Sequence, residues 1–405
     1  MYGNLIGIIM FNQIYITMKR LFLLFALCGM VAVGCTKGGV DDDINNGGNK
    51  GGNKHKIYYT TTDNQKVIPY STETLVFGAQ LVSNTYRNGL GVLRFSSDVT
   101  KIGYAAFEYC ASLTSITIPD SVTSIGDRAF SGCTSLASVT IPDSVTKIGD
   151  ATFEDCASLT SITIPDSVTS IGDWAFEDCA SLTSITIPDS VASIGVEAFY
   201  GCSSLTSMTI GNGVTSIGTG AFRDCSRLTS ITIPDGVTSI GSSAFYGCTG
   251  ELIINSKIVE TDYDETNYPF KIGWLVGLKF FSVIIGNGVT SIGNYTFYSC
   301  DSLTSITIPD SVTSIGDFTF ECCTTLDSIT IPDSVTKIGN CAFNLCRSLK
   351  EVYCRSITPP MGGYGMFLNN DPGFRIYVPT ESVEAYKSAE VWSDYASCIV
   401  GYDFE

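Results

Sequence analysis

Cysteine recurs along the chain at a constant spacing of 23 residues, and this regularity constrains the fold more than any other feature of the sequence. A unit of this length cannot enclose an apolar core alone, so its copies must stack and bury their apolar residues against one another. Ten cysteines keep the spacing, and Gly277 takes the cysteine place in one longer unit. The sequence therefore predicts a capped solenoid of eleven units over residues 89–354, with cysteines at Cys110, Cys133, Cys156, Cys179, Cys202, Cys225, Cys248, Cys300, Cys323 and Cys346.

Each unit combines one strand with two turns. Apolar residues alternate with hydroxyl residues from Leu113 to Ile118, which predicts a short strand with one buried side. Pro119 ends this strand, because proline fixes φ and offers no N–H donor. We expect short parallel strands on the concave face of the solenoid, and turns and 3-10 segments on its convex face. Further apolar residues of the unit return to the core, namely Val122, Ile125, Ala129 and Phe130.

The order of these residues resembles the BspA-like class of leucine-rich repeats. A Leu-x-x-Ile-x-Ile-Pro strand, then Val-x-x-Ile-Gly, then Ala-Phe and Cys, stands between Leu113 and Cys133 and again between Leu136 and Cys156. The resemblance covers residues 90–354. It implies a leucine-rich-repeat solenoid and a bacterial surface protein that attaches to host or neighbouring-cell components. A repeat fold alone does not identify the ligand.

The amino terminus resembles that of an exported lipoprotein. A short basic stretch precedes an apolar run, residues 21–33, that is too short to span a bilayer. The run ends in small residues before Cys35, as in a bacterial lipoprotein cleavage box. The aspartates at 41–43 resemble the surface-export signal of Bacteroides-type lipoproteins. An ordinary secretory signal with an incidental cysteine is the alternative.

These resemblances imply that the folded part is anchored to a membrane through the amino-terminal residues. Residues 1–35 form a signal-peptide region with cleavage and lipidation at Cys35, and residues 36–55 form a flexible polar tether. The expected location is the cell outer membrane, with a lipid-anchored chain exposed on the extracellular side. Residues 56–88 and 355–405 lack the period, so we expect them to cap the two apolar ends of the array.

One unit departs from the template by its length. Residues 249–277 form an extended unit, and insertions on a rigid scaffold are natural places for specificity. The alternative is a tolerated bulge whose aromatic side chains pack against the repeats. The candidate ligand-binding residues of this unit are Tyr263, Tyr268, Phe270 and Trp274.

A second candidate surface comes from threonines that recur at the same place in successive strands. Thr117, Thr140, Thr163 and Thr186 should point outward from the concave face. They would form a flat, uncharged, hydroxyl-rich surface suited to contact with a protein or a glycan. A purely structural ladder of cross-strand contacts is the alternative.

Most catalytic and metal chemistry is disfavoured by composition. His55 is the only histidine, which argues against serine-histidine triads and multi-histidine metal sites. Thiols spaced by 23 residues are expected to be buried structural groups and not zinc ligands. Aspartates also recur in the turns, for example at Asp120 and Asp189. Two roles are open for this column: calcium binding, or formation of the turns themselves. Cys322, Cys341 and Cys398 lie off the column and are the candidates for disulfide pairing.

The sequence leaves two functional classes. The first is a surface binding or adhesion protein whose partner is a protein or glycan at the cell surface; the second is a structural or accessory lipoprotein of a surface assembly. Neither is an enzyme, and neither needs a cofactor or a metal. The net charge of −17 also disfavours nucleic acid as a partner. Clustering on one face of residues that break the repeat, such as Gly211, Gly286, Trp174 and Arg223, would favour specific binding.

Overall fold

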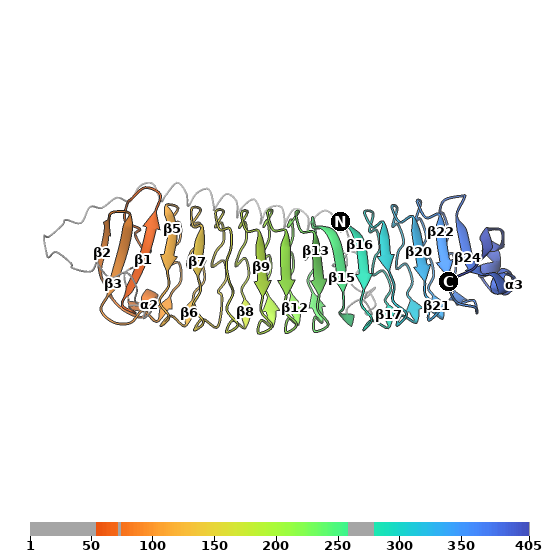
Figure 1. The fold of residues 1–405 in the computed structure, drawn as a ribbon, viewed down its shortest axis with the longest axis horizontal. Helices are drawn as coiled ribbons and strands as arrows, with labels where there is room; N and C mark the ends of the chain where they lie inside the picture. Colours follow the sequence, from red (N-terminus) through yellow and green to blue (C-terminus); the bar gives the residue numbers. More distant parts are fainter. Residues whose placement is uncertain (1–53, 72–73, 258–278, 405) are drawn as a thin grey trace, which may run out of the picture. The chain divides into compact units, whose positions relative to one another are not determined.

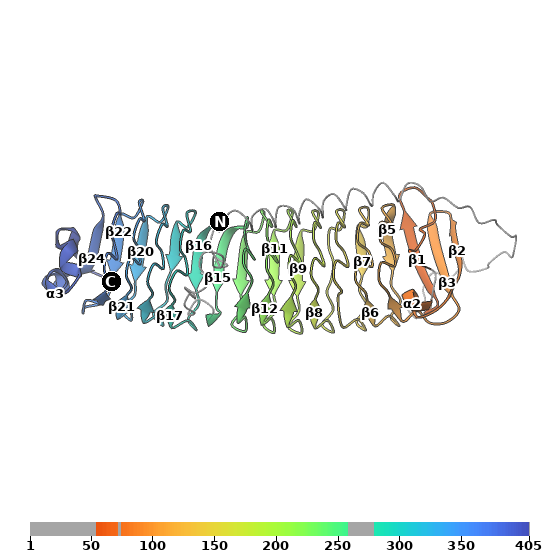
Figure 2. The same ribbon diagram turned by 180° about the vertical axis from the view of Figure 1, so that it is seen from behind.

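The computed structural model describes residues 54–71, 74–257 and 279–404. Within these residues the chain winds into a parallel β-solenoid of about 12 turns with a spacing of about 23 residues, which confirms the predicted fold class. Figures 1 and 2 show the strands of successive turns side by side in one row. None of the described helices is long and apolar enough to cross a membrane.

The first strand of each turn lies in a ladder that we call the sheet side, corresponding to the predicted concave face. The 23-residue register is kept from turn to turn, as in the pairing of Ser184 with Ser207 and of Thr186 with Thr209. Isolated bridges at Ser161 continue the ladder between β7 and β9. Its parallel strands are β5 (Leu113–Thr117), β7 (Ser138–Thr140), β9 (Ser184–Ile187), β11 (Ser207–Ile210), β13 (Ser230–Ile233), β15 (Thr249–Ile254), β16 (Lys279–Ile285), β18 (Ser305–Thr307), β20 (Ser328–Ile331), β22 (Glu351–Cys354) and β24 (Arg375–Pro379).

A second parallel ladder runs through the other half of the turns, which we call the turn side. Turns and 3-10 segments were expected there. In the described repeats this half holds turns and two-residue strands, because the Ser-Ile or Lys-Ile pair of one unit lies in register with that of the next. These strands are β4 (Lys101–Ile102), β6 (Ser124–Ile125), β8 (Ser170–Ile171), β10 (Ser193–Ile194), β12 (Ser216–Ile217), β14 (Ser239–Ile240), β17 (Ser291–Ile292), β19 (Ser314–Ile315), β21 (Lys337–Ile338) and β23 (Met361–Gly362).

Left-handed residues shape the turn side. Arg128 and Gly132 have φ angles of 56° and 73°, and equivalent residues of other units have similar values. The N–H groups of Arg128, Phe130 and Gly132 donate to carbonyl oxygens 22 residues later, each at 2.8 Å. These bonds to the following unit hold non-glycine residues such as Arg128 in a conformation that they adopt only at a cost.

Columns of identical side chains fill the core. Phe107, Phe130, Phe153, Phe176, Phe199, Phe222 and Phe245 form one stack with ring centroids 5.1 to 5.5 Å apart. A second stack runs from Phe297 to Phe367 at 5.1 to 5.3 Å. Leucine, isoleucine, valine and cysteine form parallel buried columns beside them. Each turn therefore completes the core of its neighbours, as the repeat predicted.

The amino-terminal end is built from antiparallel strands. They are β1 (Lys56–Thr61), β2 (Leu81–Arg87) and β3 (Leu90–Phe95), with the short helix α2 (Thr74–Phe77) beside them. The strand order is β2-β3-β1-β5-β7. We expected Leu90–Phe95 to start the parallel array, but β1 lies between β3 and β5 and pairs antiparallel with both. The apolar alternation of β3 suits either direction of pairing, which is why the sequence did not distinguish them.

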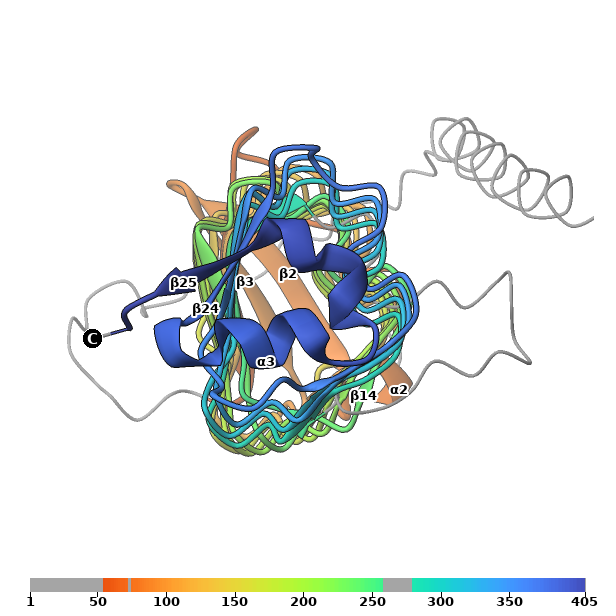
Figure 3. The same cartoon turned by 90° about the vertical axis from the view of Figure 1, so that its right-hand side faces the viewer.

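The carboxyl-terminal end is covered by short helices. The segment divides into η3 (Thr380–Ser382), α3 (Val383–Ser388) and η4 (Trp392–Cys398) before β25 (Ile399–Tyr402). The Thr380 hydroxyl donates to the Asp403 carboxylate over 2.6 Å. Viewed along the axis, α3 crosses the last turns (Figure 3). The buried side chains of Tyr386 and Trp392 close the apolar end there.

Candidate binding surface

Outward-facing threonines form a continuous column on the sheet side. Strand alternation buries Ile116 and Ile118 and leaves Thr117 between them exposed. The same holds in later turns, and the exposed residues, which we call the threonine face, are Thr117, Thr140, Thr163, Thr186, Thr209, Thr232, Thr307 and Thr330. The four predicted threonines, Thr117, Thr140, Thr163 and Thr186, are among them.

The hydroxyls of the threonine face differ from those of the threonines beside them. Thr160, Thr183, Thr206 and Thr229 donate to carbonyl oxygens of the preceding turn over 3.1 to 3.4 Å. Within the described residues, no hydroxyl of the threonine face bonds to a protein group in this way. A structural ladder therefore describes the threonines beside the threonine face. The hydroxyls of the threonine face itself remain free for water or a ligand.

The column changes in the later turns. Ile253 and Ile284 occupy the threonine position in β15 and β16, where they pair with each other. Tyr353 and Tyr377 take the position in β22 and β24, with ring centroids 4.9 Å apart. The longest run of threonines therefore covers the turns from Thr117 to Thr232.

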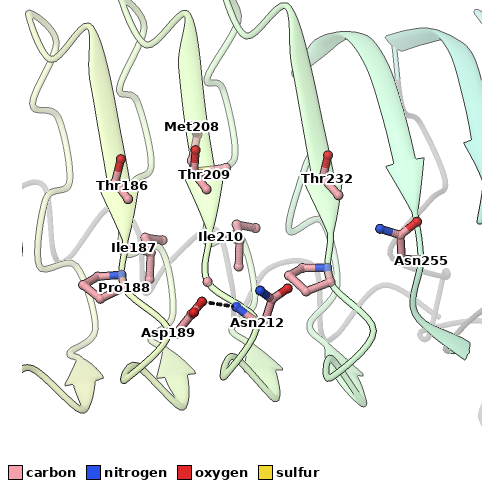
Figure 4. Close-up of a pocket in the computed structure, with 12 residues that line it drawn as sticks. Thr186, Ile187, Pro188, Asp189, Met208, Thr209, Ile210, Asn212, Thr232 and Asn255 are labelled. Atoms are coloured by element: carbon pink, nitrogen blue, oxygen red, sulfur yellow. Dashed lines mark hydrogen bonds between the residues drawn. The ribbon is translucent and has the colours of Figure 1, made fainter. Parts of the chain in front are cut away.

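A groove opens beside the last threonines of this run, from Thr186 to Thr232. It lies where the column of prolines that follows the strands is interrupted. Most turns carry proline after the strand, as at Pro188 and Pro234, but the turn between these two carries Gly211. Figure 4 shows Pro188, Asn212 and Asn255 around this break in the proline column. The volume of the groove is ≈ 490 Å³, within the range of small-molecule sites, about 300–1,000 Å³. Its lining residues are Thr186, Ile187, Pro188, Asp189, Met208, Thr209, Ile210, Gly211, Asn212, Thr232, Pro234 and Asn255.

Backbone contact explains why glycine stands in this turn. A Cβ atom on Gly211 would lie 2.4 Å from the carbonyl carbon and oxygen of Pro188. The next N–H, that of Asn212, donates to Asp189 Oδ1 over 2.7 Å, drawn as the dashed line in Figure 4. This turn therefore lies closer to its predecessor than a side chain at residue 211 would permit.

The groove combines polar and apolar lining groups. Three threonine hydroxyls from consecutive turns and the carboxamides of Asn212 and Asn255 line it, together with two proline rings. Of the described residues that line the groove, Asp189 alone carries charge. Of the four threonines proposed from the sequence as ligand-binding residues, Thr186 lines the groove; Asp189 and Gly211, which the sequence also singled out, line it too. Asn255 was missed, although it stands after Ile254 where other turns have Ile-Pro.

Other departures from the repeat lie on the turn side. Trp174 Nε1 donates to Glu197 Oε2 over 2.9 Å. The guanidinium carbon of Arg223 lies 5.7 Å from the Tyr200 ring centroid and 5.2 Å from that of Tyr246. These residue types are frequent at interface hot spots. The departures thus divide between two sides of the solenoid and do not form a single cluster on one face.

The column cysteines are buried, and Asp189 bonds to the following turn. Cys133 to Cys248 lie in the core. Desolvation by burial raises the pKa of the Cys300 thiol to about 12. Cys322, Cys341 and Cys398, the candidates for pairing, are free thiols. The residues that the structure describes contain no cluster of three or more metal-ligating His, Cys, Asp or Glu side chains. The Asp189 carboxylate accepts the N–H of Asn212 in the following turn, whereas the turn hypothesis expected a bond to the backbone of its own turn.

Several sequence candidates lie outside the described residues. They are the lipidation site Cys35 and the aromatic residues of the extended unit, Tyr263, Tyr268, Phe270 and Trp274. Their roles stay predictions.

Comparison with known proteins identifies relatives of the repeat array. The family model of the BspA type leucine rich repeat region matches the chain in six copies, over residues 86–195, 147–263 and 277–370. A leucine-rich repeat protein from Bacteroides ovatus is 28% identical; the match covers 79% of this chain and 90% of that one, with a TM-score of 0.39. A leucine rich cell surface protein from Faecalibacterium prausnitzii is 31% identical over 78% of this chain and 89% of that one, also with a TM-score of 0.39. No curated protein sequence matches the chain.

Proposed function

This chain belongs to the family of BspA type leucine-rich repeat proteins, and on that premise we propose that it is a cell-surface binding protein that presents its threonine face to a protein or glycan of a host or neighbouring cell. Solenoids of this family typically act as non-catalytic interaction scaffolds, and no enzyme family is indicated. Proteins with BspA-like repeats are cell-surface proteins. Binding at a surface is therefore the activity that fold and family support together.

The observation that carries the proposal is the set of free hydroxyls on the threonine face. A neighbouring column of threonines uses its hydroxyls to bind the preceding turn. The threonine face does not, so its donors and acceptors are available to a partner. They are held on strands whose cores are fully stacked, so little conformational entropy is lost when a partner binds.

Membrane attachment is a further part of the proposal. It rests on the lipoprotein-like sequence around Cys35 and on the polar residues that follow it. A lipid at Cys35 would anchor the chain to the outer membrane, and residues 36–55 would hold the solenoid away from the bilayer. Metabolic labelling with an alkyne fatty acid tests this: wild-type chain should be labelled and Cys35→Ala should not. Equal labelling of the two would refute the anchor.

The aromatic residues of the extended unit are proposed as a supplementary contact. Tyr263, Tyr268, Phe270 and Trp274 follow β15, whose neighbour Asn255 lines the groove. Aromatic side chains offer large contact areas to proteins and sugars alike. Replacing the four with serine should reduce ligand capture while leaving the thermal unfolding temperature unchanged.

A capture experiment tests the main proposal. The full-length chain is immobilised and exposed to host extracellular-matrix, mucin and bacterial-envelope extracts, and each retained component is identified and its direct binding measured. The double variant Thr117→Arg/Thr163→Arg places two long charged side chains on the threonine face. The matched control Thr123→Arg/Thr169→Arg changes exposed threonines of the same turns on the turn side.

We expect a host or mucin component to bind the wild type and the control but not the threonine-face variant. Equal binding by all three would contradict the use of this face. Capture of envelope components alone would instead favour an accessory subunit of a surface assembly.

A further inference from the structure

The groove at Gly211 has the chemistry of a site for an uncharged, hydroxyl-rich ligand. Thr186, Thr209 and Thr232 each offer a hydroxyl that both donates and accepts, and Asn212 and Asn255 each offer an amide that does the same. Sugar hydroxyls need this mixture of donors and acceptors. We infer that the groove binds a neutral glycan, an inference that rests on the proposed function of the threonine face.

Charge separates this ligand class from the alternatives. An acidic glycan would meet the Asp189 carboxylate, and the described lining residues include no cation to offset it. A cationic ligand would find only that carboxylate, whose Oδ1 already accepts the Asn212 N–H at 2.7 Å. A neutral ligand brings no charge of its own to desolvate and is not repelled by Asp189.

The sequence lowers the charge at this place relative to the rest of the array. Asp120, Asp143, Asp166 and Asp189 give four successive turns a carboxylate after the proline, and the next turn has Asn212 instead. In the β15 turn, an amide replaces the proline itself, at Asn255. Both changes put a neutral amide beside the groove. A proline ring in place of Gly211 would narrow this groove.

The geometry suits a chain of sugars that lies along the solenoid axis. Three consecutive turns contribute one threonine each, and neighbouring strands lie about 4.8 Å apart, close to the length of one pyranose unit. The rings of Pro188 and Pro234, which line the groove two turns apart, supply apolar surfaces for sugar C–H groups. Specificity would then come from the amides and from the length of the glycan that fits between the prolines.

The repeat supplies matched variants for the test. Thr209→Val removes a hydroxyl from the groove but keeps a β-branched side chain, and Thr140→Val makes the same change in the same column outside it. Asn212→Asp installs the residue that most other turns carry at this position, so it should fold while it loses the two amide donors. Asp166→Asn makes the reverse change outside the groove.

The full-length chain is applied to an array of neutral oligosaccharides, namely cello-, xylo-, manno- and galacto-oligosaccharides and neutral mucin-type glycans, with sialylated and sulfated glycans alongside. Retained sugars are then titrated by calorimetry. We expect a neutral oligosaccharide to be retained. Thr209→Val and Asn212→Asp should each weaken its binding roughly three- to tenfold, as the loss of one or two hydrogen bonds predicts, and the two outside variants should not.

Retention of no neutral glycan, or equal affinity of Thr209→Val and Thr140→Val for it, would overturn the inference. A protein captured through the threonine face but insensitive to Thr209→Val would overturn it while leaving the proposed function intact. Failure of the Thr117→Arg/Thr163→Arg variant to change any capture would refute the proposed function itself.

Discussion

The thiol of Cys179 donates a hydrogen bond to the carbonyl oxygen of Phe153 in the preceding turn, with 3.2 Å between sulfur and oxygen. The same bond recurs in other turns at 3.0 to 3.3 Å. Cysteine suits this position because its side chain is small and apolar and carries a weak S–H donor. The 23-residue spacing of cysteine is therefore explained by core packing from turn to turn.

Replacing Cys179 with alanine should destabilise the solenoid. The change deletes the Sγ atom from a fully buried site, leaves a cavity and leaves the Phe153 carbonyl with one donor fewer. We expect the unfolding free energy to fall by about 1–3 kcal/mol. Calorimetric unfolding of Cys179→Ala and of Cys322→Ala, a partly exposed thiol, provides the comparison. Equal losses in the two variants would contradict a structural role for the buried thiol column.

Alkaline pH should destabilise the fold through the same thiols. Burial raises the pKa of Cys300 to about 12, whereas an unfolded cysteine titrates near ~8.5. The folded state thus keeps a proton that the unfolded state releases. The stabilisation is complete below pH ~8.5 and is lost progressively as the pH rises toward ~12. Unfolding temperatures measured from neutral to alkaline pH should fall across this window, less steeply in Cys300→Val. A pH-independent unfolding temperature would rule out this linkage.

The phenylalanine stack makes a separate prediction. Phe199 is fully buried, with its ring centroid 5.1 Å from that of Phe176 and 5.3 Å from that of Phe222. Phe199→Ala should cost about 3–5 kcal/mol, because it opens a cavity and interrupts two stacked pairs. Phe199→Leu keeps most of the volume and should cost clearly less. Chemical denaturation of both variants distinguishes lost volume from lost stacking: similar costs would show that ring geometry dominates.

Repetition made the fold predictable from the sequence. The alternation from Leu113 to Ile118 determines which residues of the strand are buried, and the 23-residue spacing determines which residues stack. The two-residue strands such as β10 were not predicted, because their pairing follows from backbone register and from left-handed residues such as Glu197, which have no distinctive sequence pattern.

The candidate site was only partly predictable. Thr186 belongs to the repeat, so its outward direction followed from strand alternation. The sequence marked Gly211 as a departure from the repeat, but the groove depends on the missing ring between Pro188 and Pro234, and the sequence alone did not show that this absence opens a groove. Asn255 lies in a turn whose alignment to the template is disturbed by the extended unit, which hid its equivalence to proline.

A last prediction concerns Tyr353, where the threonine column gives way to tyrosine. Its hydroxyl donates to Glu351 Oε2 over 2.9 Å, and burial followed by the Glu351 carboxylate raises the Tyr353 pKa to about 12. Glu351→Gln removes the negative charge that opposes phenolate formation but leaves the surrounding rings in place. The Tyr353 pKa should therefore fall below about 12 and stay above the ordinary value of ~10. Ultraviolet absorbance titration of the phenolate, with Tyr353→Phe to identify the signal, measures it. Glu251→Gln is the matched control, because Glu251 lies at the same strand position and its partner is Ser282. An unchanged Tyr353 pKa in Glu351→Gln would mean that burial alone sets it.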